Sequence, residues 1–309
     1  MSLRSLQQKL CKVFPRRVYT SITCLFAKDE NIAKESKPRT RDHMKRTEHS
    51  PRQKSLCTAQ VVRIDDFSIS IKGLQLFVTK QQRSNAEFKA GQWVDMFIPG
   101  VDTVGGFSIC NSPKDLQENG IIELAVKFSD HPPAYWIHSK CQLNDNVKVR
   151  VGGNFFYEHK PFNNTLLIAG GVGINPLLSI FRHKRDRICD IGDSSTDVEG
   201  KTALIYSAKT CEDLIFQKQI QEMCMETNAL CHFHVTKEKV NNRAAYESPF
   251  TSITETKVSL ETISNLTKQL PPQMTNCYIC GPPPFIERVE DYLVACGYPK
   301  NHIYYEKWW

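Results

Sequence analysis

The sequence predicts a small antiparallel β-barrel followed by a doubly wound parallel α/β domain. Residues 53–160 consist of short apolar or alternating segments separated by glycines, with a single helix candidate among them. Residues 161–309 instead alternate strand-like and helix-like segments, which is the pattern of a parallel sheet covered by helices. Residues 1–52 follow neither pattern and are expected to be a leader and linker.

The barrel prediction depends on strand candidates that are rich in β-branched and aromatic residues. A helix is expected over Pro132–Gln142, because prolines are tolerated in a first turn. Many short strands around one helix are typical of a closed barrel. The predicted strands are Ala59–Ile64, Leu74–Thr79, Trp93–Ile98, Ile121–Lys127 and Val147–Val151.

The second domain is predicted from regular alternation, with polar loops at 189–200 and 237–256. Strands separated by helices of this length indicate right-handed crossovers in one parallel sheet. The predicted strands are Leu166–Ala169, Ala203–Ser207, Leu230–Val235, Cys277–Cys280 and His302–Glu306. The predicted helices are Pro176–Arg187, Glu212–Glu226, Ser259–Gln269 and Pro284–Cys296.

The positive charge of the chain is confined to its first part. Residues 1–50 carry 12 Lys/Arg and 5 Asp/Glu, whereas the remaining 259 residues carry 28 of each. A nucleic-acid-binding domain carries its basic residues on the folded surface, so this distribution argues against that class. Residues 1–28 contain six basic residues and no acid, with leucines on one helical face, which is typical of a mitochondrial presequence. The alternative is a basic tail with no targeting role.

Composition excludes several other classes. No apolar run is long enough for a transmembrane helix. The twelve cysteines are expected to be mostly free thiols, because the chain is neither small nor visibly secreted. The CxxC pair Cys277 and Cys280 lies in a strand-like run, where an offset of three places the side chains on opposite faces. We therefore expect neither a metal site nor a dithiol centre there.

Two glycine-containing turns give the first functional signal. Ile168–Pro176 and Tyr278–Phe285 each follow an apolar strand and open a helix. Such turns allow phosphates to approach backbone N–H groups at a helix N-terminus, where the helix dipole favours negative charge. The pair predicts a small-molecule nucleotide across the carboxyl edge of one sheet.

With these turns, residues 55–309 resemble the ferredoxin–NADP reductase superfamily. The segment Gly105–Cys110 and the ending Glu306-Lys-Trp-Trp309 are typical of one group within it. The resemblance implies a six-stranded antiparallel flavin-type barrel that binds FAD, and a nucleotide-binding domain that binds NAD(H). It divides the chain into a presequence and linker (1–52), a flavin-type barrel domain (53–160) and an NAD-binding domain (161–309).

The resemblance assigns residues on the NAD side. It implies that Cys280 and Glu306 flank the nicotinamide, although a buried Cys is commonly only a small hydrophobe. The basic and acidic residues Lys209, Glu212 and Asp213 after the second strand favour NADH over NADPH. The residues implied to bind the dinucleotide are Gly170, Gly171, Val172, Gly173, Ile174, Asn175, Gly281 and Pro282.

On the flavin side, the sequence departs from the superfamily. The resemblance implies that Phe107, Ser108 and Trp308 contact the flavin, with core packing as the alternative for each of them. Gly105 stands where the superfamily has an arginine that clamps the FAD pyrophosphate. A second phosphate-binding element reads His131-Pro-Pro-Ala134, so both phosphate contacts are weakened or relocated.

The sequence thus predicts an oxidoreductase that takes a hydride from NADH, passes it through FAD and delivers electrons to an unknown acceptor, which can be a protein. The alternative is a catalytically weak NAD(H)-binding module that has lost its flavin clamp. The presequence predicts a location in the mitochondrial matrix. No cysteine cluster predicts an iron–sulfur centre, and no nucleic-acid partner is expected.

Overall fold

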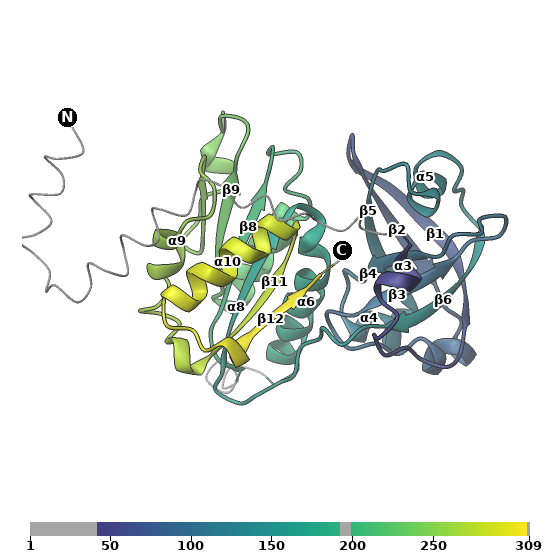
Figure 1. Cartoon of the computed structure of the whole chain (residues 1–309), viewed down its shortest axis with the longest axis horizontal. Coiled ribbons are helices and arrows are strands. Elements are labelled where there is room, and N and C mark those ends of the chain that lie inside the picture. Colours follow the sequence, from purple (N-terminus) through teal and green to yellow (C-terminus); the bar gives the residue numbers. More distant parts are fainter. Residues whose placement is uncertain (1–41, 192–198, 308–309) are drawn as a thin grey trace, which may run out of the picture. The chain divides into compact units, whose positions relative to one another are not determined.

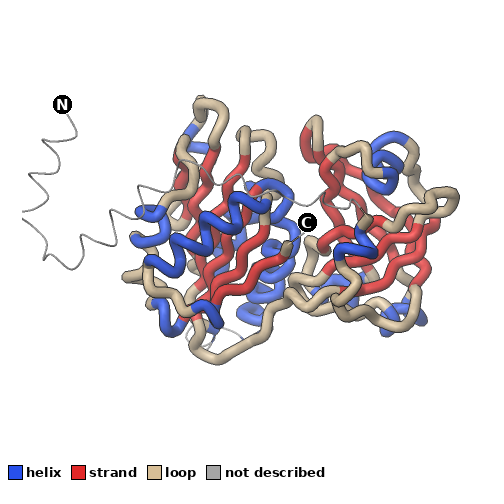
Figure 2. The backbone as a smooth tube through the Cα atoms, in the orientation of Figure 1, coloured by secondary structure: helices blue, strands red, loops and turns tan. Residues whose placement is uncertain are grey.

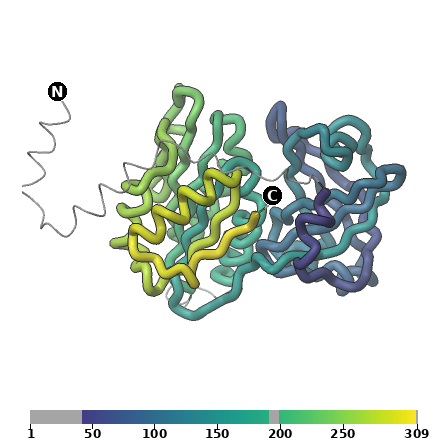
Figure 3. Tube along the Cα trace, in the orientation of Figure 1, coloured from purple at the N-terminus to yellow at the C-terminus, as the bar shows by residue number. Residues whose placement is uncertain are grey.

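A computed structural model describes residues 42–191 and 199–307 (Figure 1). The basic segment 1–28 and Trp308, both given functions above, lie outside the described residues. The described residues form two six-stranded sheets, drawn in red in Figure 2. Figure 3 shows that the chain completes the first sheet before it enters the second.

The first sheet is an antiparallel barrel, as predicted. Its strand order is β4-β3-β6-β1-β2-β5, and all pairs are antiparallel. The two ends of this order meet at a bridge between Ile109 and Leu124, which closes the barrel. The strands are β1 (Cys57–Ser68), β2 (Ile71–Phe77), β3 (Trp93–Phe97), β4 (Gly105–Ser108), β5 (Ile121–Lys127) and β6 (Asn146–Gly152).

Side chains of β3 alternate between the inside and the outside of the barrel. Val94 and Met96 belong to the hydrophobic core of the barrel. Trp93 and Asp95 point to the opposite face, since successive strand residues alternate. Trp93, which the sequence favoured as barrel core, is fully buried but lies outside that core.

Two barrel elements were not predicted as such from the sequence: strand β4 and helix α4 (Pro113–Asn119). Signals for α4 were present, because Pro113 occupies its first position and Gly120 ends it in the left-handed conformation. The helix expected over Pro132–Gln142 is α5 (Pro132–Ser139). Its end is earlier because Lys140 leaves the helical conformation.

The second sheet is parallel throughout, and the doubly wound prediction is confirmed. Its order is β10-β9-β8-β7-β11-β12. Strand β10 lies within 237–256, where the sequence predicted a loop; the β-branched residues Thr251 and Ile253 pair with β9 there. The strands are β7 (Asn164–Gly170), β8 (Thr202–Ala208), β9 (Leu230–Val235), β10 (Thr251–Thr254), β11 (Thr275–Cys280) and β12 (Ile303–Glu306).

Helices cover both faces of this sheet, and Figure 1 shows α10 crossing one of them. One hydrophobic cluster joins Cys280 to residues of α6 and α8, and another joins Cys277 to residues of α9 and α10. The two cysteines therefore lie on opposite faces, as predicted. The helices are α6 (Ile174–Ile191), α8 (Gln217–Thr227), α9 (Leu260–Ser264) and α10 (Pro283–Ala295). Short 3-10 turns occur at Lys80–Asn85, Gly171–Gly173, Arg243–Ala245, Pro272–Met274 and Lys300–His302.

The segment from Asp42 to Arg52 differs from the linker expected there. It contains a short helix, α3 (His43–Arg46), whose His43 side chain is buried. Arg52 bridges to Gly152 at the end of β6. A polar composition suggested a linker, but these polar groups have long-range partners on the barrel that composition does not reveal.

Helix α6 is joined to the barrel by buried polar contacts. Asn175 Nδ2 donates to the Ala125 carbonyl (2.7 Å), and Ser179 Oγ donates to the Asn111 carbonyl (2.7 Å). Further along the same face, Arg182 pairs with Glu123 (2.9 Å). These contacts attach the barrel to the first helix of the parallel sheet. None of the helices in the described residues is both long and apolar enough to span a bilayer.

Candidate nucleotide site

The parallel sheet has one topological switch point, between β7 and β11. From β7 the chain proceeds outward through β8, β9 and β10, and then returns to place β11 on the other side of β7. In open α/β sheets ligands bind at the carboxyl edge of such a point, because the connecting loops diverge there. Gly170 and Cys280 end these two strands, so the two predicted turns meet at this edge.

The two turns interlock through their glycines. A Cβ on Gly173 would overlap the carbonyl of Cys280 and lie 2.7 Å from Gly281 N. A Cβ on Gly281 would lie 2.8 Å from the Phe285 ring and 3.1 Å from the Gly170 Cα. Gly173 and Gly281 are thus required for close backbone packing between the turns.

Gly171 is the open residue of the first turn. Its φ is +57°, and an added Cβ would meet nothing within 4 Å. It begins the 3-10 turn Gly171–Gly173, which leads into the N-terminus of α6 and so to the positive end of an 18-residue helix dipole. Open backbone at such a terminus fits the pyrophosphate of a dinucleotide.

The neighbouring predicted residues have different surroundings. Ile174 is completely buried in the hydrophobic core, so its side chain is unavailable to a ligand, and Val172 packs against the same core. Asn175 is nearly buried and donates to the barrel, while its Oδ1 has no hydrogen-bond partner. Pro282 is exposed at the N-cap of α10. Among these side chains, only Asn175 has a buried carbonyl oxygen that can still accept a hydrogen bond, for example from a ligand.

Cys280 and Glu306 lie side by side at the same edge. They are register partners in β11 and β12, and their side chains are 1% and 8% exposed. Burial raises the pKa of the Glu306 carboxyl to about 8, and the Trp93 side chain acts in the opposite direction. Glu306 is therefore largely protonated at neutral pH.

The influence of Trp93 on Glu306 was not predicted, because no local signal relates residue 93 to residue 306. Within the described residues, no group of three or more His, Cys, Asp or Glu side chains could hold a metal ion. The Cys280 thiol and the Glu306 carboxyl are the chemically reactive groups at this edge.

The residues that favoured NADH in the sequence have structural partners. Glu212 accepts a hydrogen bond from Ile69 N (2.9 Å), at the tip of the β1–β2 hairpin. Asp213 accepts one from Ser70 Oγ (3.5 Å) at the same tip. Lys209 is exposed beyond the end of β8. The two acids therefore attach the hairpin, and the preference for NADH over NADPH stays a prediction.

On the barrel, Phe107 and Ser108 face opposite sides of β4. Phe107 is in register with Val94 and packs against the barrel core. Ser108 is in register with Trp93 and is 8% exposed. As register partners in an antiparallel pair, Ser108 and Trp93 lie on the same face of the barrel wall.

The space for an arginine clamp at residue 105 is already filled. A Cβ on Gly105 would lie 2.5 Å from the Phe107 ring and 2.8 Å from Pro133. The ring and α5 thus occupy the volume that a larger side chain would need. Gly106, on the outer face, is covered by the His43 ring in the same way.

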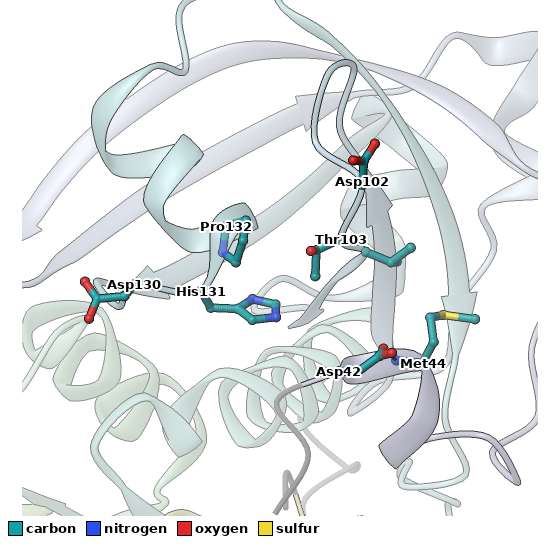
Figure 4. Close-up of a pocket in the computed structure, with 8 residues that line it drawn as sticks. Asp42, Met44, Asp102, Thr103, Asp130, His131 and Pro132 are labelled. Atoms are coloured by element: carbon teal, nitrogen blue, oxygen red, sulfur yellow. Dashed lines mark hydrogen bonds between the residues drawn. The ribbon is translucent and has the colours of Figure 1, made fainter.

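The second phosphate element also lacks what a pyrophosphate requires. Pro132 and Pro133 form the first turn of α5, so two N–H groups that would face a phosphate are missing. A cavity of about 410 Å³ beside this turn is lined by Asp42, Asp102, Asp130 and His131 and, among the described residues, by no Lys or Arg (Figure 4). The residues present do not fit FAD held by its pyrophosphate at this place.

The chain was compared with known proteins. The family model described as oxidoreductase NAD-binding domain matches residues 167–291. An oxidoreductase NAD-binding domain-containing protein 1 from Danio rerio is 45% identical over 276 residues, which cover 88% of this chain and 98% of the relative. The Homo sapiens protein of the same name is 44% identical over 278 residues, with 88% and 86% covered.

A solved structure has the same fold. The ferredoxin NADP+ reductase from Neisseria gonorrhoeae, with bound FAD and NADP, has a TM-score of 0.62 at 16% identity, over 81% of this chain and 98% of that chain. Identity at this level shows the shared fold alone. By its identity to relatives over most of its length, the chain belongs to the oxidoreductase NAD-binding domain-containing protein 1 family, and it shares its fold with this ferredoxin NADP+ reductase.

Proposed function

We propose that this protein is an NAD(H)-dependent oxidoreductase whose dinucleotide lies across the carboxyl ends of β7 and β11. The observation that carries the proposal is the interlocking of the two turns, which brings Gly173 against Cys280, the register partner of Glu306. A nucleotide site in this position is supported by the family model that covers the same strands.

Each group in the site has a stated task. The N-terminus of α6 binds the pyrophosphate, and Gly171 allows its close approach. Cys280 and Glu306 flank the nicotinamide and orient it. Bound NADH supplies a hydride, and its ring becomes cationic as the hydride leaves. Glu306 can donate a hydrogen bond while protonated, and above about pH 8 its carboxylate favours the cationic ring.

The sequence also predicted FAD in the barrel, and the proposed function does not include this FAD. Phe107 and Pro133 fill the clamp position, and the cavity beside α5 presents carboxylates to a group that is itself anionic. These observations favour one feature of the alternative prediction, the NAD(H)-binding module that has lost its flavin clamp. That feature is a barrel that holds no resident FAD. Electrons then pass from NADH to an external two-electron acceptor, or the site binds NAD(H) without turnover.

We expect the purified full chain, incubated with FAD and then desalted, to have no flavin absorption bands while it still binds NADH. The expected NADH affinity is micromolar, as for a typical cosubstrate. Absorption spectroscopy and calorimetric titration measure the two properties. Steady-state oxidation of NADH with a diffusible quinone, which is a two-electron acceptor, then distinguishes an oxidoreductase from a binding module.

Three outcomes separate the hypotheses. Flavin bands that persist and bleach with NADH would show a flavoenzyme and contradict the fit argument at Gly105. NADH binding with no quinone reduction would identify a binding module. Absence of NADH binding would overturn the proposed function itself.

We also propose import into the mitochondrial matrix, on the basis of the basic, acid-free segment 1–28. A fluorescent protein fused after residue 52 is expected to localise to mitochondria. Replacing Arg4, Arg16 and Arg17 with glutamate should leave it diffuse, because presequences require positive charge. Mitochondrial localisation of this charge-reversed variant would contradict the proposal.

A further inference from the structure

The tip of the β1–β2 hairpin reaches from the barrel to the loop that follows β8, residues 209–216. Ile69 N donates a hydrogen bond to Glu212 Oε1 at 2.9 Å. Ser70 Oγ donates one to Asp213 Oδ1 at 3.5 Å. Both acceptors are carboxylates, and a hydrogen bond to a charged group is stronger than one between neutral groups. The hairpin therefore holds this loop by its two acidic side chains.

Aromatic rings extend the contact beyond the tip. The Phe67 ring of β1 meets the Phe216 ring edge-on, with the centroids 4.8 Å apart. Phe216 ends the loop with φ +63°, and a non-glycine residue keeps this conformation only where its surroundings hold it. The Arg182 guanidinium of α6 lies 5.4 Å from the Phe216 ring centroid and also pairs with Glu123 of β5 (2.9 Å). The end of the loop is thus held by groups from both domains.

The backbone of the loop is attached to the parallel sheet. Lys237 N donates to the Lys209 carbonyl (2.9 Å), and Tyr206 Oη donates to the Asp213 carbonyl (3.0 Å). The carboxylates of Glu212 and Asp213 face the hairpin instead. The loop therefore combines a backbone fixed by its own domain with acidic side chains whose position depends on the barrel.

The loop lies at the adenosine end of the proposed dinucleotide site. In the strand order, β8 is on one side of β7 and β11 is on the other. A dinucleotide with its pyrophosphate at the turn after β7 and its nicotinamide beside Cys280 extends its adenosine towards β8. Residues 209–216 begin directly after Ala208, where β8 ends. The hairpin thus contacts the edge of the sheet on the opposite side of β7 from Cys280.

Packing between the domains does not account for the tip. The Ile69 side chain is 94% exposed, so it buries little apolar surface. Asn175 and Ser179 of α6 already attach the barrel through buried hydrogen bonds. The tip instead supplies two donors to two carboxylates on the nucleotide edge.

We propose that the β1–β2 hairpin is a positioning element for the adenosine half of the dinucleotide, in which Ile69 N and Ser70 Oγ order the loop after β8. The assignment to adenosine rests on the proposed function, whereas the contacts themselves do not. A ligand loses less binding free energy to a loop that is already ordered than to one that it must order itself. Release of the hairpin therefore weakens binding of the adenosine half and spares the nicotinamide half.

The experiment removes both donors from the full chain in the double variant Ile69→Pro with Ser70→Ala. Proline has no N–H, and the first central position of a β-turn tolerates it. Ile69→Ala with Ser70→Thr is the matched control, because it keeps an N–H and a hydroxyl at the same positions. Calorimetry measures the affinity for NADH and for ADP-ribose, which contains the adenosine half. Competition with NADH measures the affinity for reduced nicotinamide mononucleotide, which lacks adenosine.

The variant without the two donors should bind NADH and ADP-ribose about fivefold more weakly than the wild type, the lower end of typical coupling between distinct sites. Its affinity for the mononucleotide should be unchanged, and the control variant should bind all three ligands as the wild type does. Wild-type affinity for ADP-ribose in the variant without donors would overturn the inference. Equal weakening for all three ligands would also overturn it, since that result indicates a general structural effect.

A second variant covers the case in which the first does not fold. Ser70→Asp places a carboxylate beside those of Glu212 and Asp213, and the repulsion should release the hairpin with the same loss of ADP-ribose affinity. Ser70→Asn is its control, because it has nearly the same size, is neutral and can still donate. Equal ADP-ribose affinities of these two variants would contradict the inference. A wild-type protein that binds none of the three ligands would refute the proposed function and, with it, the assignment to adenosine.

Discussion

Gly173→Val is expected to abolish NADH binding and to lower the stability of the protein. A Cβ at this position would overlap the Cys280 carbonyl and lie 2.7 Å from Gly281 N, both of which are backbone groups that cannot rotate away. The two turns would have to separate, and the nucleotide edge between β7 and β11 would open. Overpacking of this kind costs about 1–3 kcal/mol. Calorimetric titration with NADH and thermal unfolding measure the two effects.

The control is Gly100→Ala. Gly100 has φ +74° and open space around it, so alanine costs only backbone strain of about 1 kcal/mol. It should lower the unfolding temperature slightly and leave the NADH affinity unchanged. Wild-type affinity in Gly173→Val would show that the turns need not interlock, and would remove the main support for the site.

Gly173 illustrates how far the sequence analysis reached. The glycine turns predicted the residue and the edge of the sheet, because such turns have a local signature. The reason why residue 173 must be glycine was predicted differently. The sequence suggested close approach of a phosphate, whereas the structure shows close packing against the second turn, about 110 residues later. The open position is Gly171, which the sequence could not distinguish from its neighbours.

In the fold, too, the features with a local sequence pattern were predicted. The hydrophobic periodicity and the glycines between segments were sufficient to predict both sheets, and the bounds of Ile121–Lys127 and Leu230–Val235 agree with β5 and β9. Strand β10 and the start of α8 were placed differently, because polar loops and strand edges have weak local patterns. In α8, Phe216 adopts φ 63° just before the helix, which therefore begins five residues after Glu212.

The residues missed altogether are those whose partners are remote. His43, Arg52 and Asp95 are ordinary polar residues in the sequence, and only the folded barrel brings them together. Segment 42–52 was therefore assigned to a linker on composition. Its role can be tested by removing the carboxylate that all its contacts share.

Asp95→Asn is expected to destabilise the protein by about 3–5 kcal/mol, because two guanidinium groups and one imidazole lose a buried carboxylate. The unfolding temperature should fall on the order of 10 °C for a chain of this size. Hydrogen bonds from His43, Arg150 and Arg52 lower the pKa of the Asp95 carboxyl despite its burial. Its stabilisation is therefore present above its unfolded pKa and is lost as pH falls through the lower folded value.

Asp65→Asn is the matched control, since Asp65 pairs with Arg63 (2.8 Å) at the surface of the same barrel. Exposed pairs contribute about 0–1 kcal/mol, so this variant should unfold within a few degrees of the wild type. Thermal unfolding at pH 7 and at several pH values below 4 compares the two. The wild type should lose part of its advantage over Asp95→Asn below pH 4, because protonation of Asp95 removes the same charge. An Asp95→Asn variant as stable as Asp65→Asn would show that segment 42–52 is not anchored through this carboxylate.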